Sequence, residues 1–344
     1  MPSINGRLWP EFSHPLVAMK HLRLVLTLAL ALGAALHAAT AKIKVLILDG
    51  QNNHQWAVTS PMLKKILEDT GRFSVDVSTS PAAKPKPPGL PKNATPEQKA
   101  AQPEKLKAHA AALADYETTA AAQWVAWRPK FTDYAAVVSN YNGETWPAEV
   151  RTAFEAYVRH GGGFVSYHAA DNAFPEWPEY NVMIGIGGWG GRSEKSGPYL
   201  RLRTQGWIKD LTAGPGGGHG PQHEFLVEAR ADHPIVRGLP AKWLHAQDEL
   251  YHGLRGPADN VTVIASAMSD RTKEHEPMLM VIPYGKGRVF HTTLGHGVEA
   301  VNGLGFQVTF ARGVEWVAAG DVTQPAPKAG ELTADRAAVA RASK

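Results

Sequence analysis

Histidines recur in this 344-residue chain at points where a predicted strand has just ended. His168 follows the apolar run 164–167 and precedes two alanines, which let the chain turn sharply. His54 lies in a polar loop after the aliphatic run 42–48, and His296 follows a later apolar run. A single histidine of this kind is usually a hydrogen-bonded core residue. Because ligands bind at the carboxyl edge of an open parallel sheet, three such histidines together indicate a functional site.

Carboxylates and a tyrosine accompany these histidines in the second half of the chain. Asp248, Glu249 and Tyr251 share one short segment, and a glycine-rich loop contains His219 and His223. Histidine combined with carboxylate is the chemistry of metal sites and of general acid–base pairs. A glycine and a proline lie between His219 and His223, which argues against a helical ligand pair and leaves a loop-borne pair open.

The absence of cysteine restricts the chemistry of such a site. Thiolate metal ligands, cysteine nucleophiles and disulfides are excluded together. A site of histidine and carboxylate suits Zn²⁺, Fe²⁺, Mn²⁺ or Ni²⁺, and the sequence does not select one of them. We predict metal ligands among His54, His168, His219, His223 and His296, catalytic roles for His168, Asp248, Glu249, Tyr251 and His296, and substrate contacts from Asn142, Asp171 and Trp189.

Pattern and charge exclude several classes of ligand. No G-x-x-x-x-G-K-[ST] loop is present and no G-x-G-x-x-G follows the first strand, so we predict no nucleotide cofactor. No G-x-S-x-G nucleophile elbow is present either. The formal net charge is only +4, without a basic stripe that carries interleaved aromatic residues. Nucleic acid is therefore not an expected partner.

Strands and helices alternate in the first half of the chain, which predicts a doubly wound parallel sheet. The expected strands span 42–48, 73–78, 134–139 and 164–167, followed by 224–229, 261–267, 278–283 and 288–292. The expected helices span 61–70, 147–159 and 303–318. Residues 171–222 show little periodicity but contain many glycine, tryptophan and histidine residues, as functional loops on a rigid scaffold do.

The N-terminus has the pattern of a secretory signal peptide. Basic residues at 20–23 precede the apolar run 24–36, and a small-x-small cleavage site follows. This run is too short to span a membrane. We predict that residues 1–41 are removed on export to the periplasm or the extracellular space. Since Met19 is the better start, residues 1–18 are interpreted as a mis-called upstream extension.

Two regions differ in composition from the predicted core domain at 42–320. Residues 82–130 are rich in Ala, Lys and Pro, and surface helices are expected within 95–127. So long a connection is unusual in a compact domain, and it is interpreted either as a lid or as a solvated insertion. The tail at 321–344 is again rich in Pro, Ala and Lys and is expected to be flexible.

Several of these segments resemble the ThuA-like (trehalose utilisation) family. The matching segments are the loop with His54, 161–170, 232–235, 248–251, 285–290 and 294–296, and the resemblance covers about residues 42–320. It implies a flavodoxin-like, class I glutamine amidotransferase-like α/β fold, a three-layer sandwich with a mainly parallel central sheet. In the amidotransferases a nucleophilic cysteine occupies the elbow after such a strand. His168 stands there in this chain, so amidotransferase chemistry is excluded.

The resemblance also implies sugar catabolism, with a disaccharide, a glycoside or a 3-keto-sugar as the small-molecule partner. We therefore predict an exported carbohydrate-processing enzyme that catalyses metal-assisted elimination, hydrolysis or isomerisation. One alternative is a non-catalytic sugar-binding module of the same fold, in which Trp177, Trp189 and Trp207 would supply stacking faces for the sugar. Another is a degenerate fold whose histidines only pack.

Overall fold

The computed structural model describes residues 42–340 of the chain. The predicted signal peptide at 1–41 and the last four residues of the predicted tail lie outside the described residues. Within the described range, no helix is both long enough and apolar enough to cross a membrane.

A nine-stranded mixed sheet organises this part of the chain, with the order β2-β1-β3-β4-β11-β10-β9-β7-β8. The parallel half contains β2 (Phe73–Thr79), β1 (Ile43–Asp49), β3 (Ala136–Ser139), β4 (Gly163–Tyr167) and β11 (Gly287–Thr292). The antiparallel half contains β10 (His275–Tyr284), β9 (Thr262–Met268), β7 (His223–Ala229) and β8 (Lys242–Asp248). The predicted α/β fold with parallel core strands is confirmed, and the five parallel strands follow the flavodoxin-like order.

Burial explains why these segments form central strands. All five residues of β4 are buried, and Val45 and Ile47 of β1 have no exposed surface. A strand that is covered on both faces needs apolar side chains on both, so its sequence is a continuous apolar run rather than an alternation.

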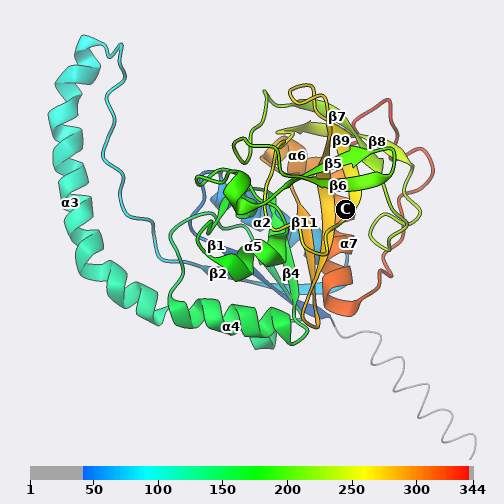
Figure 1. Cartoon of the computed structure of the whole chain (residues 1–344). Helices are drawn as coiled ribbons and strands as arrows, with labels where there is room; N and C mark the ends of the chain where they lie inside the picture. The colour runs from blue at the N-terminus through cyan, green and yellow to red at the C-terminus, as the bar shows by residue number, and fades with distance from the viewer. Residues whose placement is uncertain (1–41, 341–344) are drawn as a thin grey trace, which may run out of the picture. The chain divides into compact units, whose positions relative to one another are not determined.

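Helices cover both faces of the sheet and complete the predicted three layers (Figure 1). One core cluster contains residues of α2 (Trp56–Asp69), α6 (Val298–Asn302) and α7 (Leu304–Ala319). The other contains residues of α4 (Ala148–Arg159) and α5 (Pro178–Ile184). The helices predicted at 61–70, 147–159 and 303–318 correspond to α2, α4 and α7, which bury an apolar face against the sheet, whereas α5 and α6 were not predicted.

The insertion at 82–130 contains one helix, α3 (Pro96–Ala126), where the sequence left one or two helices open (Figure 1). Thr95 caps its first turn in a capping box with Gln98. Ala120 is its one buried residue, because the alanine-rich sequence offers few apolar anchors. The chain is fixed again just after the helix by Trp127, which is 8% exposed and donates from its indole nitrogen to Ser78 Oγ at 3.1 Å.

Several elements were not predicted from the sequence. The aperiodic stretch 171–222 contains the hairpin of β5 (Tyr199–Arg203) and β6 (Gly206–Asp210), and β8 was not among the predicted strands. Short 3₁₀ helices span Phe131–Asp133, His168–Asn172 and Glu194–Ser196.

The described part of the tail lies against the core rather than free of it. Leu332 is buried, and the Thr333 carbonyl accepts a hydrogen bond from the Leu244 amide at 2.7 Å. Close to the end of the described chain, Val339 pairs with Gly303 as an isolated antiparallel bridge. Such contacts tie down a segment whose composition alone predicts fraying.

Replacement of Phe154 tests the core between α4 and the sheet. Phe154 has no exposed surface, and its ring meets Phe164 at a centroid distance of 5.0 Å. Phe154→Ala should lower the free energy of unfolding by about 3–5 kcal/mol in a urea titration, because it leaves a cavity. The control, Val125→Ala on α3, removes a 68% exposed side chain and should change stability by less than about 0.5 kcal/mol. Equal effects of both variants would contradict this packing.

Candidate active site

His168 occupies a strained elbow directly after β4. Its backbone has a positive φ of 45°, which is uncommon for a residue with a side chain, and the residue is only 2% exposed. The next two residues are fully buried alanines, small enough for the sharp turn into the 3₁₀ helix His168–Asn172. Strain of this kind persists only where the surrounding structure enforces it, and it is concentrated at functional sites.

Hydrogen bonds fix the tautomer of His168. Nδ1 lies 2.6 Å from the carbonyl oxygen of Thr293, and because a carbonyl only accepts, Nδ1 must donate. Burial, the largest influence, lowers the pKa of His168, so the ring is neutral. Its Nε2 therefore has a lone pair, and the Tyr251 hydroxyl donates to it at 2.9 Å.

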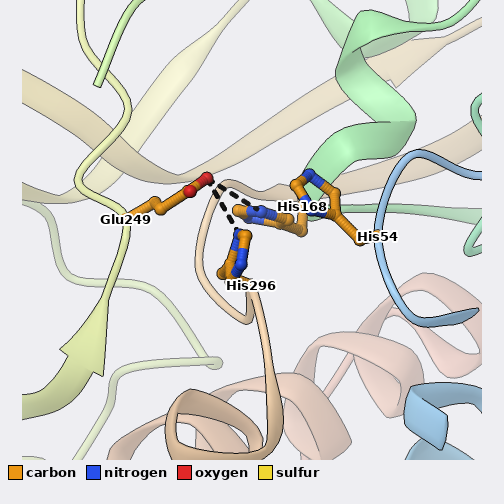
Figure 2. A group of neighbouring side chains, drawn as sticks. All are labelled: His54, His168, Glu249 and His296. Atoms are coloured by element: carbon orange, nitrogen blue, oxygen red, sulfur yellow. Dashed lines mark ion pairs between the residues drawn. The ribbon is translucent and has the colours of Figure 1, made fainter. Parts of the chain in front are cut away.

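Three imidazoles and one carboxylate converge at the carboxyl edge of the sheet. One ligand atom from each of His54, His168, Glu249 and His296 lies within 4.8 Å of the others (Figure 2). His54 follows β1, Glu249 follows β8 and His296 comes shortly after β11. Figure 2 shows the side chains pointing toward one another, with Glu249 joined to His168 and His296. We call these four residues the His/Glu cluster.

The charges within the His/Glu cluster are unequal. Burial, with the neighbouring imidazoles, lowers the pKa of His54 to about 3, so this ring is neutral. The Glu249 carboxylate raises the pKa of His296. Burial raises the pKa of Glu249, but contact with His296 and the other imidazoles outweighs burial and leaves that pKa below its ordinary value. Glu249 is therefore ionised and faces the one histidine of the cluster that readily takes a proton.

The contact between Glu249 and His296 is close but poorly aligned. His296 Nδ1 lies 2.9 Å from Glu249 Oε2, yet this buried nitrogen has no hydrogen bond of acceptable geometry. A buried ring nitrogen without a hydrogen bond is costly unless another partner satisfies it. Together with the lone pair on His168 Nε2, this observation fits a donor set for a divalent metal ion.

Tyr251 and Trp189 form one wall beside the His/Glu cluster. The Tyr251 hydroxyl lies 3.3 Å from His54 Nε2, in addition to its bond to His168. Burial raises the pKa of Tyr251 well above its ordinary value, so the hydroxyl keeps its proton. The partly exposed Trp189 packs edge-on against Tyr251 at a centroid distance of 4.8 Å. The structure thus brings these two predicted residues together.

Asp248 holds the loops that carry the cluster. Its buried carboxylate accepts hydrogen bonds from the main-chain amides of Glu249, Gly295 and His296 at 2.7–2.9 Å. It also accepts from His245 Nε2 at 2.8 Å. With these four donors bound, Asp248 positions both Glu249 and His296.

Other predicted site residues lie outside the His/Glu cluster. Asp171 is fully buried and pairs with His291 at 3.2 Å, which removes it from any substrate surface. His223 is turned toward the Pro221 carbonyl at 2.9 Å. His219 borders the cluster, with Nδ1 3.6 Å from Glu249 Oε1. Asn142 donates to the side chain of Asn53, the residue before His54.

The three tryptophans that were predicted to stack on a sugar lie in different environments. Trp177 is 2% exposed and belongs to the core beneath α4 and α5, so it offers no face to a sugar. Trp207 lies on β6 and packs against the same core cluster. Of the three, Trp189 alone packs against Tyr251 beside the His/Glu cluster.

Sequence reasoning missed Arg192, a buried residue that connects two loops of the site. Its guanidinium donates to the carbonyls of Asn172, Ala173 and Gly188 and to the side chain of Asn181, at 2.6–3.1 Å. The first two carbonyls follow the His168 elbow, and the third precedes Trp189. An arginine directly after a glycine-rich run was the available signal, since such a run has no side chains to hold its own backbone.

An Asp248→Asn variant tests the loop anchor. An amide has one acceptor oxygen in place of two and presents N–H groups to main-chain donors, so one or more of the four bonds must be lost. We expect metal affinity to fall by about 10- to 100-fold, as when other residues that orient ligands are replaced. The measurement is metal titration of the folded variant. The control is Asp270→Asn, whose carboxylate is 85% exposed. Unchanged affinity in Asp248→Asn would show that the anchor does not govern the cluster.

Comparison with known proteins identifies related sequences. A family model described as ThuA, trehalose utilisation, matches residues 92–317. The solved structure of a ThuA-like protein from Parabacteroides merdae is 39% identical, with a TM-score of 0.73, and covers 88% of this chain and 98% of its own. A cytoplasmic protein from Salmonella typhimurium is 11% identical, with a TM-score of 0.41 and coverage of 80% and 99%. No curated protein matches the chain.

Proposed function

We propose, from the premise that the chain belongs to the ThuA family of trehalose-utilisation proteins, that it is an exported sugar-processing enzyme assisted by a divalent metal ion. Its proposed substrate is a disaccharide, a glycoside or a 3-keto-sugar. The observation that carries the proposal is the convergence of three imidazoles and one carboxylate beside Tyr251. Export is supported by the N-terminal sequence pattern alone.

The three histidines of the His/Glu cluster are the proposed metal ligands. Imidazole nitrogens bind Zn²⁺, Fe²⁺ and Ni²⁺ well, and three protein ligands leave a position open, as in catalytic sites. The Thr293 carbonyl orients His168 in the way that ligating histidines are usually oriented. When bound, the metal would polarise a carbonyl or hydroxyl oxygen of the sugar.

Glu249 is the proposed general base. A ketone at C3 of a glucoside acidifies the hydrogen on C2, and the ionised carboxylate takes that proton. A double bond then forms between C1 and C2 while the group on C1 departs with its bonding electrons. Tyr251, which keeps its proton, is the proposed donor to the departing oxygen. This route needs no pair of glycosidase carboxylates.

Metal analysis of the mature protein, purified without a histidine tag, tests the ligands. We expect about one metal ion per chain, lost in His168→Ala because this variant removes a preoriented nitrogen. His223→Ala is the matched control, since His223 lies in the same region but outside the cluster. Loss of metal from both variants, or no metal in the wild type after supplementation, would contradict the metal centre.

Turnover of 3-keto-glucosides tests the base. Glu249→Gln should lower kcat by about 10²–10⁴-fold, the usual contribution of a general base. Its metal content should stay at the wild-type level, because the histidines hold the ion. Loss of the ion would instead make Glu249 a ligand. If Glu249→Gln and His168→Ala both turned over the substrate like the wild type, catalysis at this cluster would be refuted. Sugar binding without turnover would favour the binding module.

A further inference from the structure

A pocket to which several amide and charged side chains contribute lies next to the His/Glu cluster. Its volume is about 690 Å³, within the range of small-molecule sites. The loops after β1 and β3 form one wall, at 51–53 and 142–144. Residues 83–87, from the start of the insertion, form the other. The pocket therefore lies between the carboxyl edge of the sheet and the first residues of the Ala-, Lys- and Pro-rich insertion at 82–130.

Asn53 connects this pocket to the proposed metal ligands. It lines the pocket, and its Nδ2 lies 3.3 Å from His54 Nε2. Its Oδ1 accepts a hydrogen bond from Asn142 Nδ2 at 2.7 Å, and Asn142 also lines the pocket. The Asn53–His54 contact therefore joins the lining of this pocket directly to the His/Glu cluster.

The insertion wall is attached to the sheet by specific hydrogen bonds. The buried Gln51 donates to the Pro81 carbonyl and accepts from the Glu144 amide, both at 2.8 Å. The Glu144 carboxylate accepts from Tyr116 of α3 at 3.0 and 3.1 Å and from the Lys84 amide at 3.2 Å. A pocket preorganised in this way loses little entropy when a ligand binds.

The pocket has hydrogen-bond donors and acceptors that are available to a ligand. The Asn142 amide oxygen and the Lys86 ammonium group make no hydrogen bond among the described residues, and Lys84 Nζ has only a distant contact, 3.9 Å from Glu117. Pro85 and Pro87, each directly after one of the two lysines, add apolar surface. Hydroxyl groups accept from ammonium and donate to amide oxygens, and the C–H face of a sugar ring packs on apolar surface.

We propose that this pocket is a subsite for the second sugar unit of a disaccharide, with the reacting unit at the His/Glu cluster. The inference rests on the proposed sugar-processing function. It gives the insertion at 82–130 the role of one wall of a substrate subsite. The chain should accordingly prefer a disaccharide to a monosaccharide derivative with the same linkage.

Calorimetry with two probes tests the subsite: trehalose, and methyl α-glucoside, which lacks the second sugar unit. We expect wild-type protein to bind trehalose more tightly than methyl α-glucoside. Lys86→Ala and Asn142→Ala should each weaken trehalose binding by about 3- to 10-fold, the value of one hydrogen bond, and leave methyl α-glucoside unaffected. Lys107→Ala, an exposed lysine of α3 outside the pocket, is the matched control and should change neither affinity.

Three results would overturn the subsite. These are equal affinity for the two probes, equal losses for both probes in the variants, and no binding of either probe to the wild type. Metal content, measured on the same samples, separates this failure from failure of the proposed function. A metal-loaded protein without preference for trehalose refutes the subsite alone, whereas a metal-free wild type refutes the metal centre. Because Asn142 reaches His54 through Asn53, metal loss in Asn142→Ala would leave Lys86→Ala as the deciding variant.

Discussion

The buried carboxylate of Asp248 is the interaction on which the rest of the site depends. An ionised group without exposed surface is tolerated only when its oxygens are fully hydrogen-bonded, and here four donors bind them. Two of those donors, the amides of Gly295 and His296, come from the loop after β11, whereas Asp248 ends β8. The carboxylate therefore joins the antiparallel half of the sheet to the parallel half. Neither half alone contains the His/Glu cluster.

The parallel half of the site could be predicted because it follows from topology. Parallel strands present their carboxyl ends at one edge, so His54 and His168, each shortly after an apolar run, had to approach one another. Asp171 could not be placed in this way. The left-handed turn at His168 directs it inward to His291, and a single residue's φ leaves no pattern in the sequence. His223 was predicted as a metal ligand, but its ring contacts the Pro221 carbonyl and lies outside the His/Glu cluster. The loop before it has no periodic pattern from which the direction of its side chains could be predicted.

The antiparallel half was less predictable. Strand β8 (Lys242–Asp248) alternates between buried and more exposed positions, but it was not among the strands predicted from the sequence. Glu249 lies just beyond it, and its closeness to Tyr251 in the sequence was the useful signal. The family relationship, at 39% identity over most of the chain, supports the fold as a whole. The proposed chemistry rests instead on the distances and charges at the His/Glu cluster, since one fold hosts many functions.

The contacts of Arg192 have a consequence for how such a site changes in evolution. Three of its four hydrogen-bond acceptors are main-chain carbonyls, which every residue type supplies. Side chains on the two loops that it connects can therefore be exchanged without loss of the clamp, provided that the backbone keeps its path. Such exchange does not extend to Gly187, where a Cβ would lie 2.2 Å from the Asp171 carbonyl oxygen. The architecture separates what must be inherited from what can vary.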